Sequence, residues 1–427
     1  MKRRLAILCA LALLAVAVVT AVCLFTLTAT RCDFHYRLAE VDCVRQSVDP
    51  FRVWNEDVTV RPYYSNNPNR RSIPEGCTEM ISVYVPWEYT LMLPFAWLGK
   101  ETAWWAYSLL SFAALGLLVG VVFTRRRFHE TKRRMPLAEA TLCATVPLMA
   151  VAYAIWSNFQ VGNHMALVLT AAVLMASCLN RKREVAAGFC WAVMMIKPQI
   201  GLAFAIPLLL RARVVTVVVA VGVCLLLSVY PAVNCQTSLL DLILEPSRAS
   251  AFAFEGCGTW PRFLCGAIPS DGDILAGLVV GAVVCAALTA LVRRERDWFV
   301  FLMPAAITSC CWTYTQAYSH AMGWFVAFVL VRALLRHPQS RFLWALAALA
   351  ACSLSRGFLA WHGLVAFAGW TFPLSDYAFR CWDSLNSTLS LGLAAAQCVW
   401  LWQTGPCPSG AAGRALGDSP HGDQDDN

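Results

Sequence analysis

The sequence predicts an all-α membrane protein whose chain crosses the bilayer many times. Of its 427 residues, 59% are hydrophobic and only 14% are charged, whereas about a quarter of the residues of a soluble domain are charged. Many apolar runs approach roughly 20 residues, the length of a helix that spans a bilayer. Basic residues gather in short connections between these runs, which is the positive-inside pattern. The net charge of +8 therefore indicates orientation in a membrane and not a nucleic-acid partner.

The first apolar run, Leu5–Thr28, follows a basic start. It is longer than the apolar region of a signal peptide, and no small-residue cleavage site clearly ends it. We therefore expect an uncleaved first span with its N-terminus in the cytoplasm. Residues 29–102 would then form a long outer loop.

Within this outer loop, apolar residues recur near helical spacing at Phe34, Leu38 and Val41. This spacing predicts an interfacial amphipathic helix that ends near Asp49, because the residue before a proline resists helical geometry. Asp33 would lie at the membrane surface, within about a turn of the first span. Its carboxylate would have either a catalytic role or only the structural role of N-cap of this helix. Its position alone does not decide between the two.

The remaining apolar runs bring the predicted total to about twelve membrane segments in one domain, residues 1–404. A second outer loop is expected at residues 232–273, and the polar tail, residues 405–427, is expected to be disordered. No internal repeat is evident, which disfavours inverted-repeat transporter folds. The further predicted spans are Ala103–Phe123, Leu137–Trp156, Asn163–Leu179, Val214–Pro231, Ile274–Val292, Trp298–Thr313, His320–Leu335, a segment from about Phe342, and Leu385–Trp402.

The stretch Val185–Leu210 contains Lys197 and Pro198 in an otherwise apolar setting and has basic residues beyond both ends. It is therefore predicted to be two short helices that meet at Lys197, not one span. A charged residue at membrane depth is costly and commonly functional, and broken helices at this depth line cavities or protein-filled sites. We expect Lys197 to face an anion, and a lipid phosphate is the obvious candidate.

Other polar residues are expected near the outer ends of spans. A short hairpin turn contains Gln160, Asn163 and His164. Their side chains can form hydrogen bonds to sugar hydroxyls or to a phosphate. More often, such residues only form the hydrogen bonds of the turn itself. His320 follows Ser319 at a span end, and a histidine suits general-base chemistry near neutral pH, although a single histidine is more often structural.

Several chemistries are disfavoured by the sequence. There is no glycine-rich phosphate loop of the kind that nucleotide enzymes use, and the cytoplasmic loops are too short for a nucleotide-sugar domain. An energy-rich donor would therefore be lipid-linked. No cofactor is expected; a divalent metal is possible but is not favoured, because Asp33 has no acidic partner close in sequence.

Five blocks of the sequence resemble glycosyltransferase family 87, in the same order. The resemblance covers roughly residues 5–335. The blocks are Asp33, Tyr36 and Ala39 with Asp49-Pro50-Phe51; Tyr84 with Pro86; Gln160–Asn163; Ala187-Gly188 through Lys197-Pro198; and Ser319-His320. The chain departs from the family around the last block. An acid or a second histidine is common near this position in the family, whereas here Ala321 follows His320.

The resemblance implies a bundle of the GT-C type and an inverting transfer of a sugar, such as mannose, from a polyprenyl-phosphate donor. The acceptor would be a glycolipid or glycan hydroxyl at the outer face of the cytoplasmic membrane. Asp33 or His320 would be the base, and Lys197 would bind the donor phosphate. Tyr36, Tyr84, Gln160 and Asn163 would bind substrate.

Three alternatives stay open at this point. A secondary transporter or lipid flippase would use Lys197 in its substrate site. A related GT-C activity would transfer another sugar, or would transfer mannose to protein, although protein O-mannosyltransferases usually have paired acids where this chain has only Asp33. A non-catalytic scaffold would leave a buried lysine without a purpose.

Overall fold

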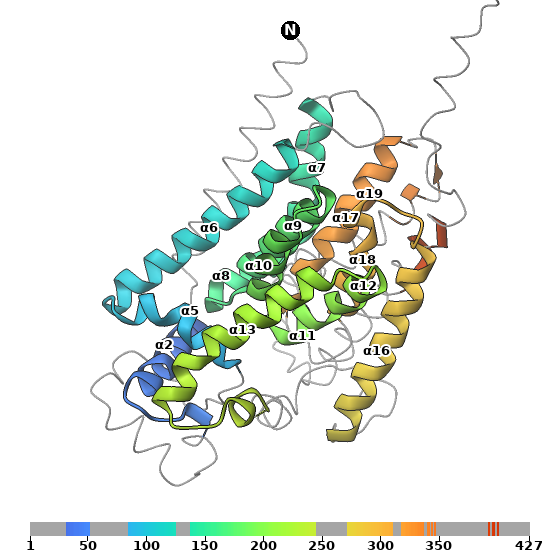
Figure 1. Cartoon of the computed structure of the whole chain (residues 1–427). Coiled ribbons are helices and arrows are strands. Elements are labelled where there is room, and N and C mark those ends of the chain that lie inside the picture. The colour runs from blue at the N-terminus through green and yellow to red at the C-terminus, as the bar shows by residue number, and fades with distance from the viewer. Residues whose placement is uncertain are drawn as a thin grey trace, which may run out of the picture.

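The structure is a computed structural model that describes residues 31–51, 84–124, 137–244, 271–310 and 317–336, with isolated residues at 340–346 and 392–400. In this part of the chain every regular element is helical (Figure 1), so the predicted all-α class is confirmed there. The helices are α2 (Cys32–Arg45), α5 (Pro86–Ala96), α6 (Lys100–Thr124), α7 (Leu137–Ala150), α8 (Ala152–Val161), α9 (Met165–Asn180), α10 (Glu184–Met194), α11 (Pro198–Gly201), η2 (Leu202–Phe204), α12 (Ala205–Leu210), α13 (Val214–Asn234), α16 (Asp271–Leu291), α17 (Trp298–Phe301), α18 (Met303–Thr308), η3 (Ala317–Gly323) and α19 (Trp324–Arg336).

Among the described residues, two helices are long and apolar enough to cross a membrane, at Lys100–Phe123 and Val214–Asn234. Several shorter apolar helices accompany them. The predicted first span Leu5–Thr28 and the tail at 405–427 lie outside the described residues, as do most residues of the two spans predicted after Phe342. The total of about twelve segments therefore stays a prediction.

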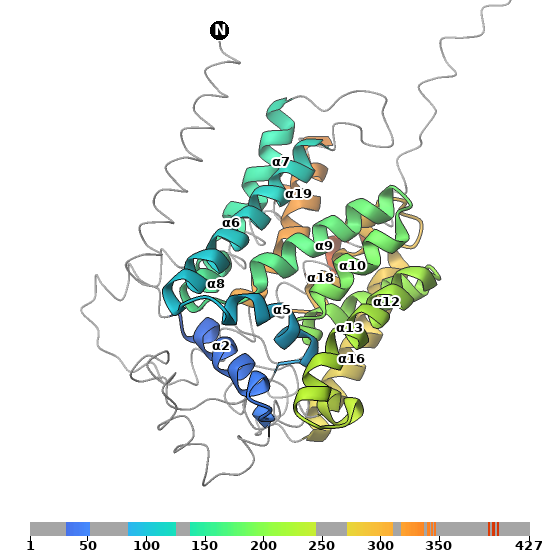
Figure 2. The same ribbon diagram turned by 60° about the vertical axis from the view of Figure 1, so that its left-hand side comes forward.

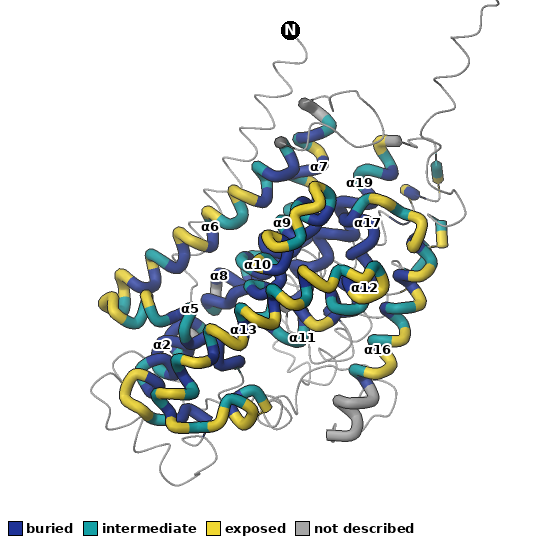
Figure 3. Tube along the Cα trace, viewed as in Figure 1, coloured by how far each residue is buried: buried dark blue, intermediate teal, exposed yellow. Residues whose placement is uncertain are grey.

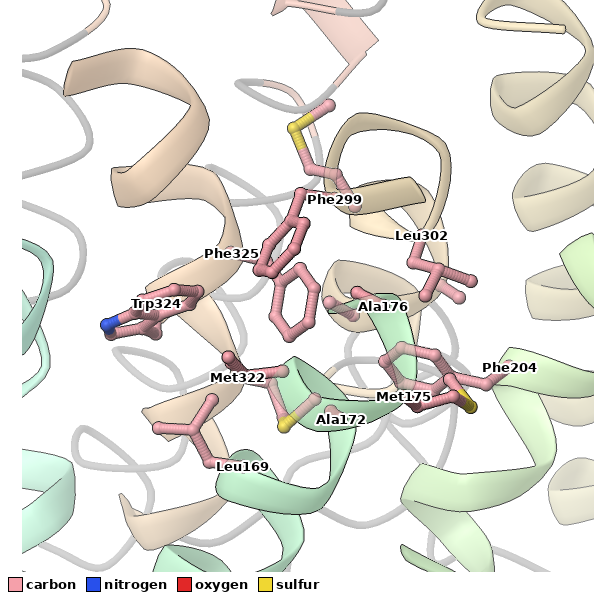
Figure 4. Close-up of a cluster of buried hydrophobic side chains, with 14 of the residues drawn as sticks. Leu169, Ala172, Met175, Ala176, Phe204, Phe299, Leu302, Met322, Trp324 and Phe325 are labelled. Carbon is pink, nitrogen blue, oxygen red and sulfur yellow. The ribbon is translucent and has the colours of Figure 1, made fainter. Parts of the chain in front are cut away.

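The centre of the bundle is α9, which is buried along most of its length (Figure 3). Its residues Ala172 and Ala176 share a cluster with the rings of Phe299, Phe325 and Trp324 from α17 and α19 (Figure 4). Small residues allow neighbouring helices to approach closely, and in a membrane such packing replaces the hydrophobic effect as the force between helices.

Part of the outer surface of the bundle, formed by α6 and α13, is apolar. On α6 and α13 many large apolar side chains are exposed, which in water would be a large unfavourable patch. Lipid tails are as apolar as these side chains, so the surface suits a bilayer. The exposed residues include Leu109, Leu110 and Leu117 on α6 and Val214, Val218, Val221, Leu225, Leu226 and Val229 on α13.

The segment predicted to break at Lys197 folds as a hairpin. The helix α10 ends at Met194, and α11 begins at Pro198, with Lys197 at its N-cap position. The indole of Trp191 donates a hydrogen bond of 2.8 Å to the carbonyl of Gly201, which joins the two arms. The prediction of two short helices meeting at Lys197 is confirmed.

Both arms of this hairpin start and end at the same end of the bundle. Glu184 begins α10, and Arg213 follows α12 and precedes α13; their side chains form an ion pair of 2.6 Å. Asn180, which lies four residues before Glu184, donates a hydrogen bond of 3.1 Å to Asp297, and Asp297 pairs with Arg332 at 2.5 Å. The basic connections beside these helix ends therefore meet at one end of the bundle, named here the basic end.

At another part of the bundle α2 packs against α5, beside the start of α6 and the end of α13 (Figure 2). Arg31 forms an ion pair of 2.7 Å with Glu101, which ties α2 to α6. Arg45 donates a hydrogen bond of 3.1 Å to the carbonyl of Ala96, which ties α2 to α5. These contacts fix the position of α2 at both of its ends.

The helix α2 differs from the predicted interfacial helix in two respects. It ends at Arg45, earlier than the expected stop near Asp49. Its polar residues are buried as well as its apolar ones, since His35, Arg37 and Glu40 are at most 4% exposed. The apolar spacing correctly predicts a helix, but the neighbouring helices cover both of its faces.

Candidate functional site

Four segments that lie far apart in the sequence meet beside the hairpin tip. They are the first turn of α2, the start of α5, the turn between α8 and α9, and the tip between α10 and α11. We name the polar residues that these segments bring together the charged cluster. Its members are Asp33, Arg37, Glu40, Tyr84, Glu88, Asn163, His164 and Lys197, and Tyr107 from α6 adjoins it.

Asp33 contacts the turn between α8 and α9. The side-chain amide of Asn163 donates a hydrogen bond of 2.8 Å to Oδ2 of Asp33, and the same nitrogen lies 3.4 Å from the hydroxyl of Tyr84. The N-cap position of α2 belongs to Arg31, and no side chain caps the helix. Asp33 is therefore not an N-cap, and its carboxylate instead faces Asn163.

Two cations converge on the ring of Tyr84. The guanidinium carbon of Arg37 lies 3.6 Å from the ring centroid, and the ammonium nitrogen of Lys197 lies 5.3 Å from it. Both distances are within the range of cation–π attraction. Lys197 is only 1% exposed, and the carboxylate of Asp33 adjoins the same tyrosine through Asn163. A lysine at the hairpin tip thus lies beside an aromatic residue that Asn163 connects to a carboxylate.

Arg37 forms a buried ion pair with Glu40, one turn further along α2. Residues three, four and seven positions apart lie on one face of a helix, so Asp33, Arg37 and Glu40 belong to the same face of α2. Buried charges persist when they are paired. Arg37 keeps one donor, its Nε, for which the structure gives no hydrogen-bond partner among the described residues.

A second chain of hydrogen bonds connects the backbone of Asn163 to Glu88 through Tyr107 and His164. Nε2 of His164 lies 2.6 Å from Oε1 of Glu88, and both side chains are almost fully buried. The hydroxyl of Tyr107 donates to the backbone carbonyl of Asn163 at 2.7 Å and lies 2.8 Å from Nδ1 of His164.

The turn that carries Asn163 depends on Gly162, whose φ is +77°. This left-handed conformation is natural for glycine and strained for other residues. A Cβ at this position would lie 2.6 Å from Cβ of Phe34 and 2.7 Å from a ring carbon of Trp104. The turn can therefore approach α2 closely enough for Asn163 to reach Asp33.

Three further residues were predicted to belong to the site, namely Tyr36, Gln160 and His320. Tyr36 lies on α2, one turn after Asp33, and is partly buried. Gln160 belongs to α8, but its side chain lies outside the described residues. His320 is buried in η3, which packs against α8 and α9. The structure thus associates His320 with the helix pair that holds Asn163.

Sequence analysis missed Arg37, Glu40, Glu88 and Tyr107 as members of this site. The spacing of Asp33, Arg37 and Glu40 on one helix would have indicated the first two. Glu88 is a carboxylate in an apolar run, the same signal that singled out Lys197. Asp33 has no acidic neighbour close in sequence, whereas Glu88 reaches the cluster from another helix.

The charged cluster combines a carboxylate that can accept a proton with two cations that can bind an anion. No group of three or more metal-ligating side chains is found among the described residues. The chemistry open to the side chains that are present is proton transfer and anion stabilisation.

Comparison with models of known protein families gives a match over the middle of the chain. The family described as Glycosyltransferase family 87 matches residues 83–313, more than half of the 427 residues. The matched stretch contains Tyr84, Asn163 and Lys197, whereas Asp33 and His320 lie outside it. No curated protein and no solved structure matches the chain.

Proposed function

Since the chain belongs to glycosyltransferase family 87, we propose that it transfers a sugar from a polyprenyl-phosphate donor to a glycolipid or glycan hydroxyl. Membership of the family makes the protein a glycosyltransferase. The donor class is inferred from the buried position of Lys197 and Arg37 in a bundle whose outer surface is apolar on α6 and α13. A lipid-linked phosphate reaches such a site from the bilayer.

The membrane topology is proposed from the positions of charge. The basic end carries the turns around Arg183, Arg213 and Arg293, and basic connections remain in the cytoplasm. The hairpin of α10 and α11 starts at this end and carries Lys197 away from it, toward α5. We therefore assign the charged cluster to the outer half of the cytoplasmic membrane, in a bundle of the GT-C type with about twelve segments.

In the proposed reaction Asp33 is the base. Its carboxylate takes the proton of the acceptor hydroxyl while the hydroxyl oxygen attacks the anomeric carbon of the donor. The bond between this carbon and the phosphate oxygen breaks, and the lipid phosphate leaves with the electron pair. Attack from the face opposite the phosphate inverts the configuration. Mannose is the sugar that the family resemblance implies.

Lys197 would stabilise the negative charge that grows on the departing phosphate, an effect that is strong where water is excluded. Arg37 is the second cation available for this purpose. Tyr84 holds both cations through its ring and would set their separation. No metal is needed in this scheme.

Asp33 is preferred to His320 as the base because of its neighbours. Asp33 contacts Asn163, which lies beside the hydroxyl of Tyr84, and Lys197 lies against the ring of the same tyrosine, so a base there would be close to the phosphate ligand. His320 would orient the acceptor. The observation that carries the proposal is that a carboxylate and a buried lysine meet at Tyr84: Asn163 joins Asp33 to the Tyr84 hydroxyl, and the ammonium of Lys197 lies 5.3 Å from the centroid of the Tyr84 ring.

The proposal is tested by sugar transfer in nanodiscs. Purified protein is given radiolabelled polyprenyl-phosphate-mannose and a crude lipid extract as acceptor, and labelled products are separated. We expect a new labelled glycolipid that Asp33→Asn does not form. If no polyprenyl-phosphate sugar donates label to any product, the lipid-phosphate donor is wrong, and Lys197 would then be better explained as a binding residue of a transporter.

A further inference from the structure

The buried pair Glu88 and His164 takes no part in the mechanism above, although both residues lie inside the cluster. Glu88 is 1% exposed and His164 is 2% exposed. Burying a carboxylate and an imidazole is unfavourable unless both are hydrogen-bonded, and an apolar pair would fill the same space without that cost. The pair therefore calls for an explanation beyond packing.

The hydrogen bonds of Tyr107 assign the tautomer of His164. A hydroxyl has one proton, and the carbonyl of Asn163 can only accept. The hydroxyl of Tyr107 therefore donates to that carbonyl at 2.7 Å and accepts from Nδ1–H of His164 at 2.8 Å. The other ring nitrogen faces Glu88 at 2.6 Å, and one proton lies between these two atoms.

This network ends at the residue that contacts the base. Glu88 holds His164, His164 holds Tyr107, and Tyr107 holds the backbone of Asn163. The side chain of Asn163 then donates 2.8 Å to Asp33. The remaining side-chain atom of Asn163, Oδ1, has no hydrogen-bond partner among the described residues, so its own side chain is oriented chiefly by Asp33 and Tyr84.

We propose that Glu88, His164 and Tyr107 are positioning residues that hold Asn163 against Asp33 and thereby orient the base. This inference rests on the proposed role of Asp33. Displacement of a catalytic group by about 1 Å is enough to lower a rate about 100-fold. Loss of the hydroxyl of Tyr107 from this network lowers the rate of the chemical step and leaves the donor phosphate on Lys197 undisturbed.

The sharpest variant is Tyr107→Phe, which removes one hydroxyl and keeps the ring in its aromatic packing. We expect kcat for transfer from polyprenyl-phosphate-mannose to fall about 10-fold or more, with the KM for this donor unchanged. Glu88→Gln is the second variant, because it removes the charge but can still form a hydrogen bond to His164. It should keep more activity than Glu88→Leu. Tyr230→Phe is the matched control, since Tyr230 packs at the edge of the same apolar cluster without joining the network.

A second readout does not depend on transfer. In protein labelled with ¹⁵N-asparagine, the side-chain amide signal of Asn163 is assigned by its loss in Asn163→Ala. Tyr107→Phe should shift or broaden this signal, whereas Tyr230→Phe should leave it unchanged.

The two readouts separate the two proposals. A wild type that transfers no sugar refutes the proposed function alone, and a displaced amide signal would then still support the positioning of Asn163. An amide signal that does not respond to Tyr107→Phe overturns the inference. Wild-type kcat in an active Tyr107→Phe variant also overturns it.

Discussion

The side-chain amide of Asn163 donates a hydrogen bond of 2.8 Å to the carboxylate of Asp33, although 130 positions separate the two residues. The contact joins the turn between α8 and α9 to the first turn of α2. It also brings the candidate base close to Tyr84, on whose ring Arg37 and Lys197 converge. The geometry of the cluster therefore depends on how closely this turn approaches α2.

Replacement of Lys197 by Met should strongly slow sugar transfer. The side chains have similar length, but Met cannot stabilise the charge on the leaving phosphate. Loss of one charged contact in a preorganised site costs about 100-fold to 1,000-fold in rate. Transfer should therefore fall to this extent in Lys197→Met and partly recover in Lys197→Arg.

The control for this variant is Lys182→Met, because Lys182 is exposed at the turn between α9 and α10. Its transfer rate should equal that of the wild type. Lys197→Met also leaves Asp33 and Glu88 with less compensating charge, so its thermal unfolding should be measured in parallel. Near-wild-type turnover in a folded Lys197→Met protein would remove Lys197 from the mechanism.

Gly162→Ala should disturb the site without touching a reactive group. The φ of +77° is unfavourable for alanine, and the new methyl group would lie 2.6 Å from Cβ of Phe34. A left-handed backbone costs a non-glycine residue about 1–2 kcal/mol, and overpacking adds about 1–3 kcal/mol. We expect a lower unfolding temperature and a lower kcat together.

Gly116→Ala is the matched control, because a Cβ at Gly116 meets no atom within 4 Å. This position is inside α6, where alanine is favoured over glycine by about 1 kcal/mol. The control should unfold at the same temperature as the wild type or slightly higher. Equal behaviour of the two variants would show that the turn is not held closely against α2.

Gly188→Ala tests the packing of the hairpin arm α10 on α13. A Cβ at Gly188 would lie 2.7 Å from Cβ of Val219 and 2.9 Å from the carbonyl of Thr216. The helices must separate, which should destabilise the protein by about 1–3 kcal/mol. Gly222→Ala on α13, where a Cβ meets nothing within 4 Å, should not. Thermal unfolding in detergent compares the two, and an unchanged midpoint for Gly188→Ala would contradict the close contact.

His35 should make stability depend on pH. It is fully buried in α2, and burial, together with the charges of Lys100 and Arg31, lowers its pKa to about 4. The unfolded chain binds the proton at a pKa of about 6.5, so the unfolded state takes up more protons between these values. Stability is therefore lost as pH falls from about 6.5 toward 4, by up to a few kcal/mol.

This effect is isolated by comparing unfolding midpoints of wild type and His35→Leu at pH 7.5 and pH 5. The wild type should lose more stability on acidification than the variant. A parallel loss in both proteins would show that His35 does not carry the dependence.

A structural feature could be predicted from the sequence when the residues that cause it are neighbours in the chain. The break at Lys197 was predictable because the charge and the proline are adjacent. The helix ends at Asn180, Leu210 and Asn234 fall within a few residues of the expected ones, because basic turns and apolar runs are local features as well.

The contacts that form the site could not be predicted in this way, because they join segments that lie far apart in the sequence. Asn163 and Tyr84 were predicted as residues that bind substrate, but the partner of Asn163 is Asp33, and Tyr84 lies against two cations. Neither contact has a signature in sequence, since each joins segments that are more than forty residues apart. The burial of the polar face of α2 was equally hidden, because an amphipathic pattern does not reveal what covers its polar side.

The most direct test of the central claim compares Asp33→Asn with the wild type in two measurements on one nanodisc preparation. Binding of polyprenyl-phosphate-mannose is measured first, and transfer of mannose in a single turnover second. A base at Asp33 predicts that the variant binds the donor as the wild type does and transfers sugar at least about 100-fold more slowly. Equal single-turnover rates in the two proteins would contradict a catalytic role for Asp33.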